Sequence, residues 1–122
     1  VPEISTCGMS EEEMQEREIP YEIGVARFRE TSRGQIMGLE HGMLKMLVSL
    51  KTRRVLGVQI VGEGATELIH IAQAVLNLKG TVDYFVKNTF NYPTLAEAYK
   101  IAGLDAFNRM PIPDEFKVKK KP

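Results

Sequence analysis

The stretch GMLKMLVSLKTRRVLGVQIVGEGATELIHIAQAVLNLKG, residues 42–80, decides the fold. Apolar residues alternate with other residues over positions 43–50, which predicts a half-buried strand. Its apolar face consists of Leu44, Met46, Val48 and Leu50. A polar turn at residues 51–54 leads into a second strand at residues 55–61. Because the turn between them is so short, the two strands are expected to pair as an antiparallel hairpin.

A helical pattern follows the hairpin. Residues 63–79 carry one apolar stripe at helical spacing, which predicts an amphipathic helix. The stripe consists of Ala65, Leu68, Ile69, Ala72, Val75 and Leu76. Gly80 is the expected end of this helix, because glycine adopts the left-handed conformation that closes many helices. Two further helices are expected, one over residues 81–88 with Thr81 as its cap and one over residues 94–108.

Two elements are predicted before the hairpin. Ser10 precedes three glutamates, a favourable cap and first turn, so residues 11–18 are expected to form a short surface helix with Glu13 completing a capping box. A half-buried strand is predicted from Tyr21 to about Glu30, because Tyr21, Ile23 and Val25 alternate with smaller or polar residues. Strands followed by helices indicate an α+β fold, an antiparallel β-sheet with helices packed on one face.

The composition limits the classes of partner. The chain has 122 residues with 16 basic and 16 acidic side chains, so its zero net charge gives no reason to expect nucleic acid or an anionic membrane. No apolar run is long enough to span a bilayer. Cys7 is the single cysteine, which favours a reducing, cytoplasmic location, and no nearby cation would activate its thiol. No Cys/His cluster has the spacing of a metal site.

One glycine-rich turn is similar to a dinucleotide-binding fingerprint. Gly62 and Gly64 lie between a strand and a helix, and Asp83 follows about twenty residues later. However, Glu67 occupies the position of the third glycine, where a carboxylate would repel phosphate. We therefore interpret this stretch as a strand-to-helix turn. Two histidines lack further ligands in the sequence, so a structural or interface role is expected for His70 and a turn for His41.

Several motifs occur in a fixed order along the chain. They are PEIS at residues 2–5, SEEEM at 10–14, GMLKMLVSLKTRRVLGVQIVGEGATELIHIAQA at 42–74, and FNYPTLAEAYKIAGLDAFNR at 90–109. Together they resemble the C-terminal dimerisation (interface) domain of the flavin-dependent pyridine nucleotide–disulfide oxidoreductases, whose fold the chain is expected to share. The resemblance covers residues 1–109 and implies a dimerisation domain there, followed by a C-terminal tail at residues 110–122 that is expected to be mobile.

The loop before the last helix departs from the family pattern. Relatives usually carry a histidine, then Pro-Thr, and a glutamate five residues after the histidine, and this pair exchanges protons with a dithiol of the partner subunit. Here Pro93, Thr94 and Glu97 match, but Tyr92 occupies the histidine position. A phenol with a pKa of about 10 is poorly suited to that proton exchange. Glu97 is then expected to complete a capping box with Thr94, whereas Tyr92 has either a flavin-site role or an interface-packing role.

One branch of the family, the soluble pyridine nucleotide transhydrogenases, is similar in FNYPT, AEAY and ELIHIAQA. These oxidoreductases pass a hydride between NADPH and NAD through FAD without a dithiol. The resemblance implies a homodimeric parent flavoenzyme with FAD- and NAD-binding domains upstream, an isolated chain without activity, and contacts from Tyr92 and Pro93 to the partner's FAD. Two alternatives stay open: the dimerisation domain of a dihydrolipoamide dehydrogenase-like disulfide reductase, and a free-standing interaction module.

Overall fold

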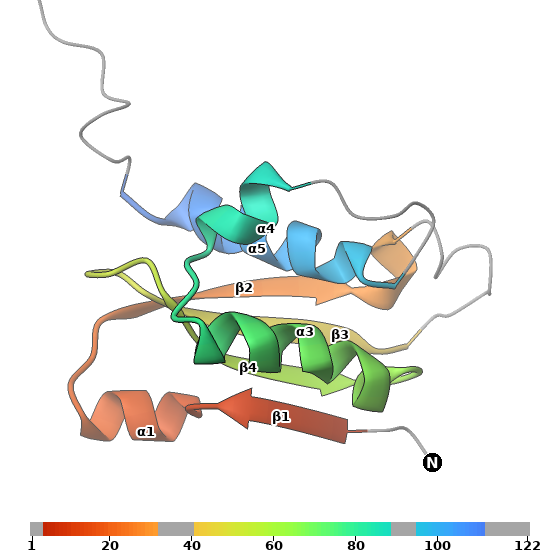
Figure 1. The fold of residues 1–122 in the computed structure, drawn as a ribbon, viewed down its shortest axis with the longest axis horizontal. Coiled ribbons are helices and arrows are strands. Elements are labelled where there is room, and N and C mark those ends of the chain that lie inside the picture. The colour runs from red at the N-terminus through yellow and green to blue at the C-terminus, as the bar shows by residue number, and fades with distance from the viewer. Residues whose placement is uncertain (1–3, 32–40, 89–94, 112–122) are drawn as a thin grey trace, which may run out of the picture.

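The computed structural model describes residues 4–31, 41–88 and 95–111. Its framework is a four-stranded antiparallel sheet in the order β1-β4-β3-β2. The strands are β1 Ile4–Gly8, β2 Tyr21–Arg27, β3 Met43–Ser49 and β4 Val55–Val61. Helix α3, Ala65–Asn77, packs on β1 and β4, while α5, Glu97–Arg109, packs on β2 and β3, so the two helices lie side by side across the sheet (Figure 1). The expected α+β architecture is confirmed.

The central hairpin forms as predicted. Strands β3 and β4 pair antiparallel, with Leu44 opposite Ile60 and Met46 opposite Val58. Leu44, Met46 and Val48 are fully buried. Leu50 is an exception, because β3 ends at Ser49 and the Leu50 side chain lies in the turn with 36% of its surface exposed. A bulge at Leu47 and Val48 adjusts the register just before this turn.

The first strand, β1, is absent from the sequence prediction. It pairs with β4 through contacts such as Thr6 opposite Gln59, so its partner lies some fifty residues away and no local pattern reveals it. Gly8 ends β1 at a φ of +79°, and a Cβ there would lie 2.2 Å from the Leu56 carbonyl oxygen. The backbone N–H of Met9 also donates to Leu56 at 2.8 Å. This close approach turns the chain from β1 into α1.

Strand β2 is shorter than predicted and presents its smallest side chains to the helices. It ends at Arg27, and Phe28–Glu30 forms a 3-10 turn that buries Phe28. Gly24 and Ala26 are buried, and a Cβ on Gly24 would lie only 2.0 Å from the Ala102 carbonyl oxygen of α5. Because side chains alternate along a strand, the larger Ile23 and Val25 point to the opposite face of the sheet, where they are half-buried.

The first two predicted helices form with changes at their ends. Helix α1, Glu11–Glu16, begins at Ser10, whose Oγ accepts from the Glu13 N–H at 3.2 Å, and stops two residues before the predicted end. Helix α3 lies within residues 63–79, and its apolar stripe is confirmed as part of the core. The left-handed residue after α3 is Lys79, with a φ of 57°, whereas Gly80 donates its N–H to the Val75 carbonyl at 2.7 Å. The left-handed conformation predicted for Gly80 is therefore adopted by Lys79, one position earlier.

The last two helices differ from the prediction at their starts. Helix α4 is Asp83–Lys87 and packs against α5. Thr81 does not cap it; its hydroxyl lies 3.3 Å from the Asp83 carboxylate instead. Helix α5 begins at Glu97, with Ala96 in the cap position and no side-chain cap. It is thus three residues shorter at its start than predicted, and the expected cap Thr94 lies outside the described residues, as do residues 112–122 of the tail.

Candidate functional site

The structure describes one of the three residues predicted for the flavin-facing loop. Tyr92 and Pro93 lie outside the described residues, and Glu97 is the first residue of α5. Leu95, two residues before α5, lies beside the start of α3: its Cδ1 would be 3.6 Å from a Cβ placed on Gly64. The start of α5 is therefore held against the first turn of α3.

Tyr99 fixes α5 to its neighbours. Its side chain is fully buried, and its hydroxyl donates to the backbone carbonyl of Leu68 in α3. Its ring stacks on Phe85 of α4, with ring centroids 5.1 Å apart and an angle of 16° between the planes. Burial raises the pKa of the Tyr99 phenol, so the group stays neutral and acts as a donor. The sequence does not reveal this hydrogen bond, because the partner of the Tyr99 hydroxyl is 31 residues away.

A second cluster joins the hairpin turn to α4 and α5. Arg53 donates two hydrogen bonds to Asp83, each of 3.0 Å, and its guanidinium lies 5.3 Å from the centre of the Phe107 ring. Hydrogen bonding to Arg53 holds the pKa of Asp83 below its ordinary value. Asp83 thus begins α4 in an ion pair with the hairpin turn.

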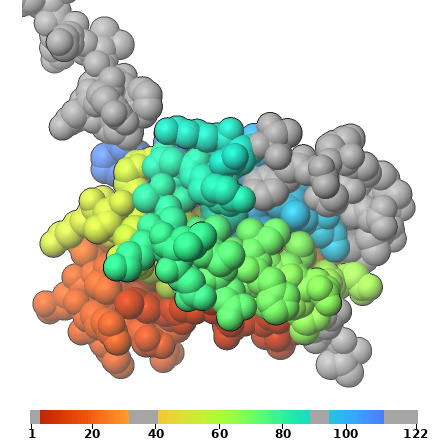
Figure 2. Space-filling model, viewed as in Figure 1, coloured from red at the N-terminus to blue at the C-terminus, as the bar shows by residue number. Residues whose placement is uncertain are grey.

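An apolar groove lies between α3 and α4, which are green and turquoise on the visible surface in Figure 2. We call it the α3–α4 groove, lined by His70, Ile71, Ala74, Val75, Leu78 and Tyr84. Leu78 is 82% exposed and Tyr84 is 44% exposed. His70 is exposed, with Nδ1 3.4 Å from the Gln73 side-chain oxygen. Large apolar side chains gathered in one exposed groove are typical of a protein-contact surface.

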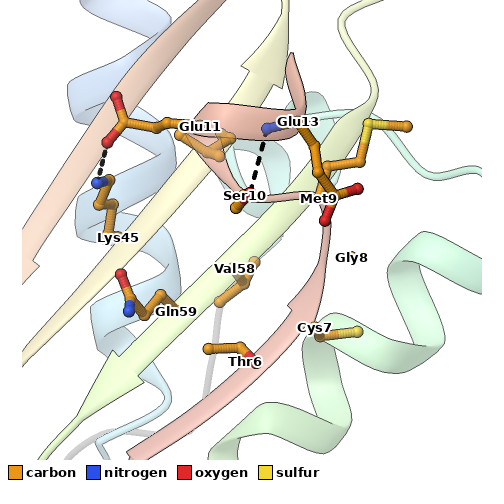
Figure 3. Close-up of a pocket in the computed structure, with 11 residues that line it drawn as sticks. Thr6, Cys7, Gly8, Met9, Ser10, Glu11, Glu13, Lys45, Val58 and Gln59 are labelled. Carbon is orange, nitrogen blue, oxygen red and sulfur yellow. Dashed lines mark hydrogen bonds and ion pairs between the residues drawn. The ribbon is translucent and has the colours of Figure 1, made fainter. Parts of the chain in front are cut away.

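A second hollow, the α1 pocket, lies between α1 and the sheet (Figure 3). It has a volume of about 220 Å³ and is lined in part by Thr6, Ser10, Lys45, Leu47 and Gln59. Lys45 and Glu11 form an ion pair across it, and the Tyr21 hydroxyl donates to Glu11 at 3.2 Å. The hydrogen bond from Lys45 lowers the pKa of Glu11. These charges are already paired, so they fix α1 on the sheet and offer no free acid or base.

Among the described residues, the remaining reactive side chains do not assemble into a catalytic centre. Cys7 packs against the core, and burial raises the pKa of its thiol, so it is not an activated nucleophile. His41 and His70 are both exposed, and each lies in a different part of the fold. Across residues 4–31, 41–88 and 95–111, no three His, Cys, Asp or Glu side chains group as metal ligands would. Within the same ranges, no helix is long and apolar enough to cross a membrane.

Comparison with known proteins places this geometry in a family. Residues 1–102 match the family model described as "Pyridine nucleotide-disulphide oxidoreductase, dimerisation domain". The soluble pyridine nucleotide transhydrogenase of Mycobacterium tuberculosis is 51% identical over 117 residues, a match that covers 96% of this chain and 25% of that protein. A transhydrogenase of the same name from Pectobacterium carotovorum is 47% identical over 113 residues, covering 90% of this chain and 75% of the relative.

Solved structures share the fold. LpdA from Mycobacterium tuberculosis superposes with a TM-score of 0.77 at 22% identity, over 84% of this chain and 22% of that one. The HOCl-induced flavoprotein disulfide reductase RclA from Escherichia coli gives a TM-score of 0.78 at 23% identity, over 85% of this chain and 26% of that one. The chain therefore spans about a quarter of the length of the mycobacterial relatives that it matches.

Proposed function

The chain belongs to the pyridine nucleotide-disulphide oxidoreductase dimerisation-domain family, and we propose that it is the dimerisation domain of a soluble pyridine nucleotide transhydrogenase. The observation that carries this proposal is the 51% identity to such an enzyme over 96% of the chain. The disulfide-reductase alternative has weaker support, because the reductase RclA is only 23% identical and shares the fold alone. In this proposal the domain is residues 1–109, and residues 110–122 are a tail.

The proposed parent enzyme transfers a hydride between NADPH and NAD. FAD, bound mainly by upstream domains of the parent, would take up and return the hydride. This chain would supply the edge of the partner subunit's flavin site through Tyr92 and Pro93. Proline fixes its own φ and restricts the preceding residue, so this loop can hold a backbone group against the flavin. A tyrosine there fits chemistry without a dithiol, because no proton must be relayed near neutral pH.

The contribution of the described residues is to hold that loop in place. Helix α5 follows the loop directly, and its first turns are fixed on α3 by Leu95 and by the hydrogen bond from Tyr99 to Leu68. Neither residue would touch FAD. They would position the loop through α5, so that the loop backbone does not have to be ordered by the cofactor.

The proposed homodimer uses the α3–α4 groove. Its lining is almost entirely apolar, and both Leu78 and Tyr84 are exposed there. Surfaces of this composition favour an obligate partner, and a second copy on a two-fold axis is the simplest closed arrangement. The paucity of cysteine, with only Cys7 in 122 residues, fits a cytoplasmic enzyme.

The full-length parent protein tests the proposal. It would be purified and examined for a flavin spectrum, and hydride transfer from NADPH to an NAD analogue would be followed beside lipoamide and glutathione disulfide reduction. Hydride transfer without disulfide reduction is the expected result. Disulfide reduction would favour the dihydrolipoamide dehydrogenase-like alternative, and a colourless parent would leave the free-standing interaction module.

A further inference from the structure

We propose that the free edge of β2 is a strand-pairing surface for a second copy of this chain, and that carboxylate side chains keep this edge closed. β2 is the last strand in the order β1-β4-β3-β2, so one of its sides has no neighbouring strand among the described residues. Such an edge presents backbone N–H and C=O groups that can bind another strand. Because the edge belongs to the sheet itself, its closure does not depend on the proposed function.

Two hydrogen bonds at the ends of β2 show which of its backbone groups face the free edge. The Leu50 N–H donates to the Pro20 carbonyl at 3.0 Å, and the Phe28 N–H donates to the Gly42 carbonyl at 3.1 Å. Residues 20 and 28 therefore face β3, and because this direction alternates along a strand, residues 22, 24 and 26 face β3 as well. The N–H groups of the odd-numbered residues between them point away from β3, toward the free edge.

A carboxylate binds each of three outward N–H groups of β2. The three hydrogen bonds run from Ile23 N–H to Glu22 at 2.9 Å, from Val25 N–H to Asp105 at 2.9 Å and from Arg27 N–H to Glu30 at 2.8 Å. Hydrogen bonds to a charged acceptor are stronger than hydrogen bonds to a neutral carbonyl oxygen. A strand added at this edge would offer only neutral carbonyl oxygens, so it would have to displace three stronger acceptors.

Asp105 is the central member of the three and reaches the edge from another element. It lies in α5, 80 residues from Val25 along the chain. Helix α5 can approach this closely because Gly24 places no side chain between β2 and the Ala102 carbonyl. The other carboxylate oxygen of Asp105, Oδ1, lies 3.5 Å from the guanidinium of Arg109. Arg109 therefore orients the carboxylate, and Asp105 blocks the middle of the edge.

The occupant that fits an opened edge is β2 of a second copy. Two β2 strands related by a two-fold axis would pair antiparallel, which is the arrangement that β2 already has with β3. With Val25 at the axis, the two valines would lie opposite each other, and β-branched pairs of this kind stabilise a sheet. In the unmodified chain the same arrangement would bring the two Asp105 carboxylates together, where their like charges repel.

Hydrogen exchange in the full-length parent tests whether the carboxylates close the edge. Exchange of the Val25 amide would be followed at low protein concentration by mass spectrometry with residue-resolved fragmentation. An amide that loses its hydrogen bond exchanges faster with water. We expect exchange at Val25 to be about tenfold faster in Asp105→Ala than in the unmodified enzyme. The amide of Met46, in the central strand β3, reports on folding and should not change.

Self-association is the second readout. The triple variant Glu22→Ala, Glu30→Ala and Asp105→Ala should form larger assemblies than the unmodified enzyme in light scattering as its concentration rises, and the Val25 amide should regain protection in them. The control is Glu12→Ala, Glu13→Ala and Glu16→Ala, which removes three exposed carboxylates from α1 and should leave the mass unchanged.

Two results would overturn the inference. Exchange at Val25 that is the same in Asp105→Ala and the unmodified enzyme would mean that the carboxylate does not close the edge. A triple variant that exchanges quickly but gains no mass would mean that the open edge does not pair with a second copy. If the Met46 amide loses its protection, Glu22→Gln, Glu30→Gln and Asp105→Asn replace the alanine changes, with smaller effects expected in the same direction. Flavin content and hydride transfer, measured on the same samples, test the proposed function separately.

Discussion

The contact between β2 and α5 predicts a large effect for the substitution Gly24→Ala. A Cβ at this position would lie 2.0 Å from the carbonyl oxygen of Ala102 and 2.9 Å from the Cβ of Ala106. Carbon and oxygen atoms need well over 3 Å, so α5 would have to withdraw from the sheet by more than about 1 Å. The shift would strain the bond in which the Val25 N–H donates to the Asp105 carboxylate at 2.9 Å.

The magnitude follows from these contacts. Over-packing of a close-packed core costs about 1–3 kcal/mol, and loss of a hydrogen bond to a charged group adds about 1.5 kcal/mol. Alanine also lowers the conformational entropy of the unfolded chain, which stabilises the folded state by roughly 0.5–1 kcal/mol. Gly24→Ala is therefore expected to lower the free energy of unfolding by about 3 kcal/mol, a large part of the stability of a domain this size.

Urea unfolding of the 122-residue chain, followed by circular dichroism at fixed protein concentration, measures the effect. Gly64→Ala is the matched control. Gly64 has a φ of +77°, but its nearest neighbour, Leu95 Cδ1, would lie 3.6 Å from a new Cβ, so only backbone strain of about 1–2 kcal/mol is expected. If Gly24→Ala left the midpoint within error of the unmodified chain, or cost less than the control, α5 would not pack on β2 as described.

Three further predictions concern α5, the hairpin turn and the groove. Tyr99→Phe removes the hydroxyl that donates to the Leu68 carbonyl and should cost about 1 kcal/mol in urea unfolding, while an unchanged midpoint would mean that the bond contributes nothing. Arg53→Gln should cost about 1 kcal/mol at pH 7. Because the folded-state pKa of Asp83 is lowered, the contribution of the pair is present above its ordinary pKa and disappears as the pH falls through the folded value. The difference in the free energy of unfolding between Arg53→Gln and the unmodified chain should therefore shrink in acid. A difference that is constant from pH 7 to pH 3 would contradict the stabilising role of the Arg53–Asp83 pair. Ala74→Arg should convert the full-length dimer to monomer in light scattering, and an unchanged mass would place the dimer contact elsewhere.

The sequence predicts best where contacts are local. The β3–β4 hairpin and α3 each follow from a periodic pattern closed by a nearby turn, and both form within a few residues of the predicted bounds. Strand β1 is missed because its pairing with β4 depends on residues some fifty positions away. The starts of α4 and α5 are predicted too early, because a threonine in a favourable position for a cap does not ensure that the backbone turns there.

The candidate site depends on tertiary contacts more than on spacing. The residues Tyr92, Pro93 and Glu97 come from the family resemblance, and only Glu97 is among the described residues. The packing that supports them could not be read from the sequence, since Tyr99 reaches Leu68 from another helix. The same holds for the orientation of β2. Alternation in its sequence predicts two faces, but it does not predict that the face with Gly24 packs against α5.

One measurement tests most directly the proposal that the parent flavoenzyme works without a redox dithiol. The full-length parent would be titrated anaerobically with dithionite while the flavin absorbance is recorded. Flavin accepts about two electrons and a redox disulfide accepts about two more. We predict complete bleaching after about two electrons per subunit. An uptake of about four electrons would reveal a dithiol, contradict the transhydrogenase assignment and return the chain to a disulfide reductase.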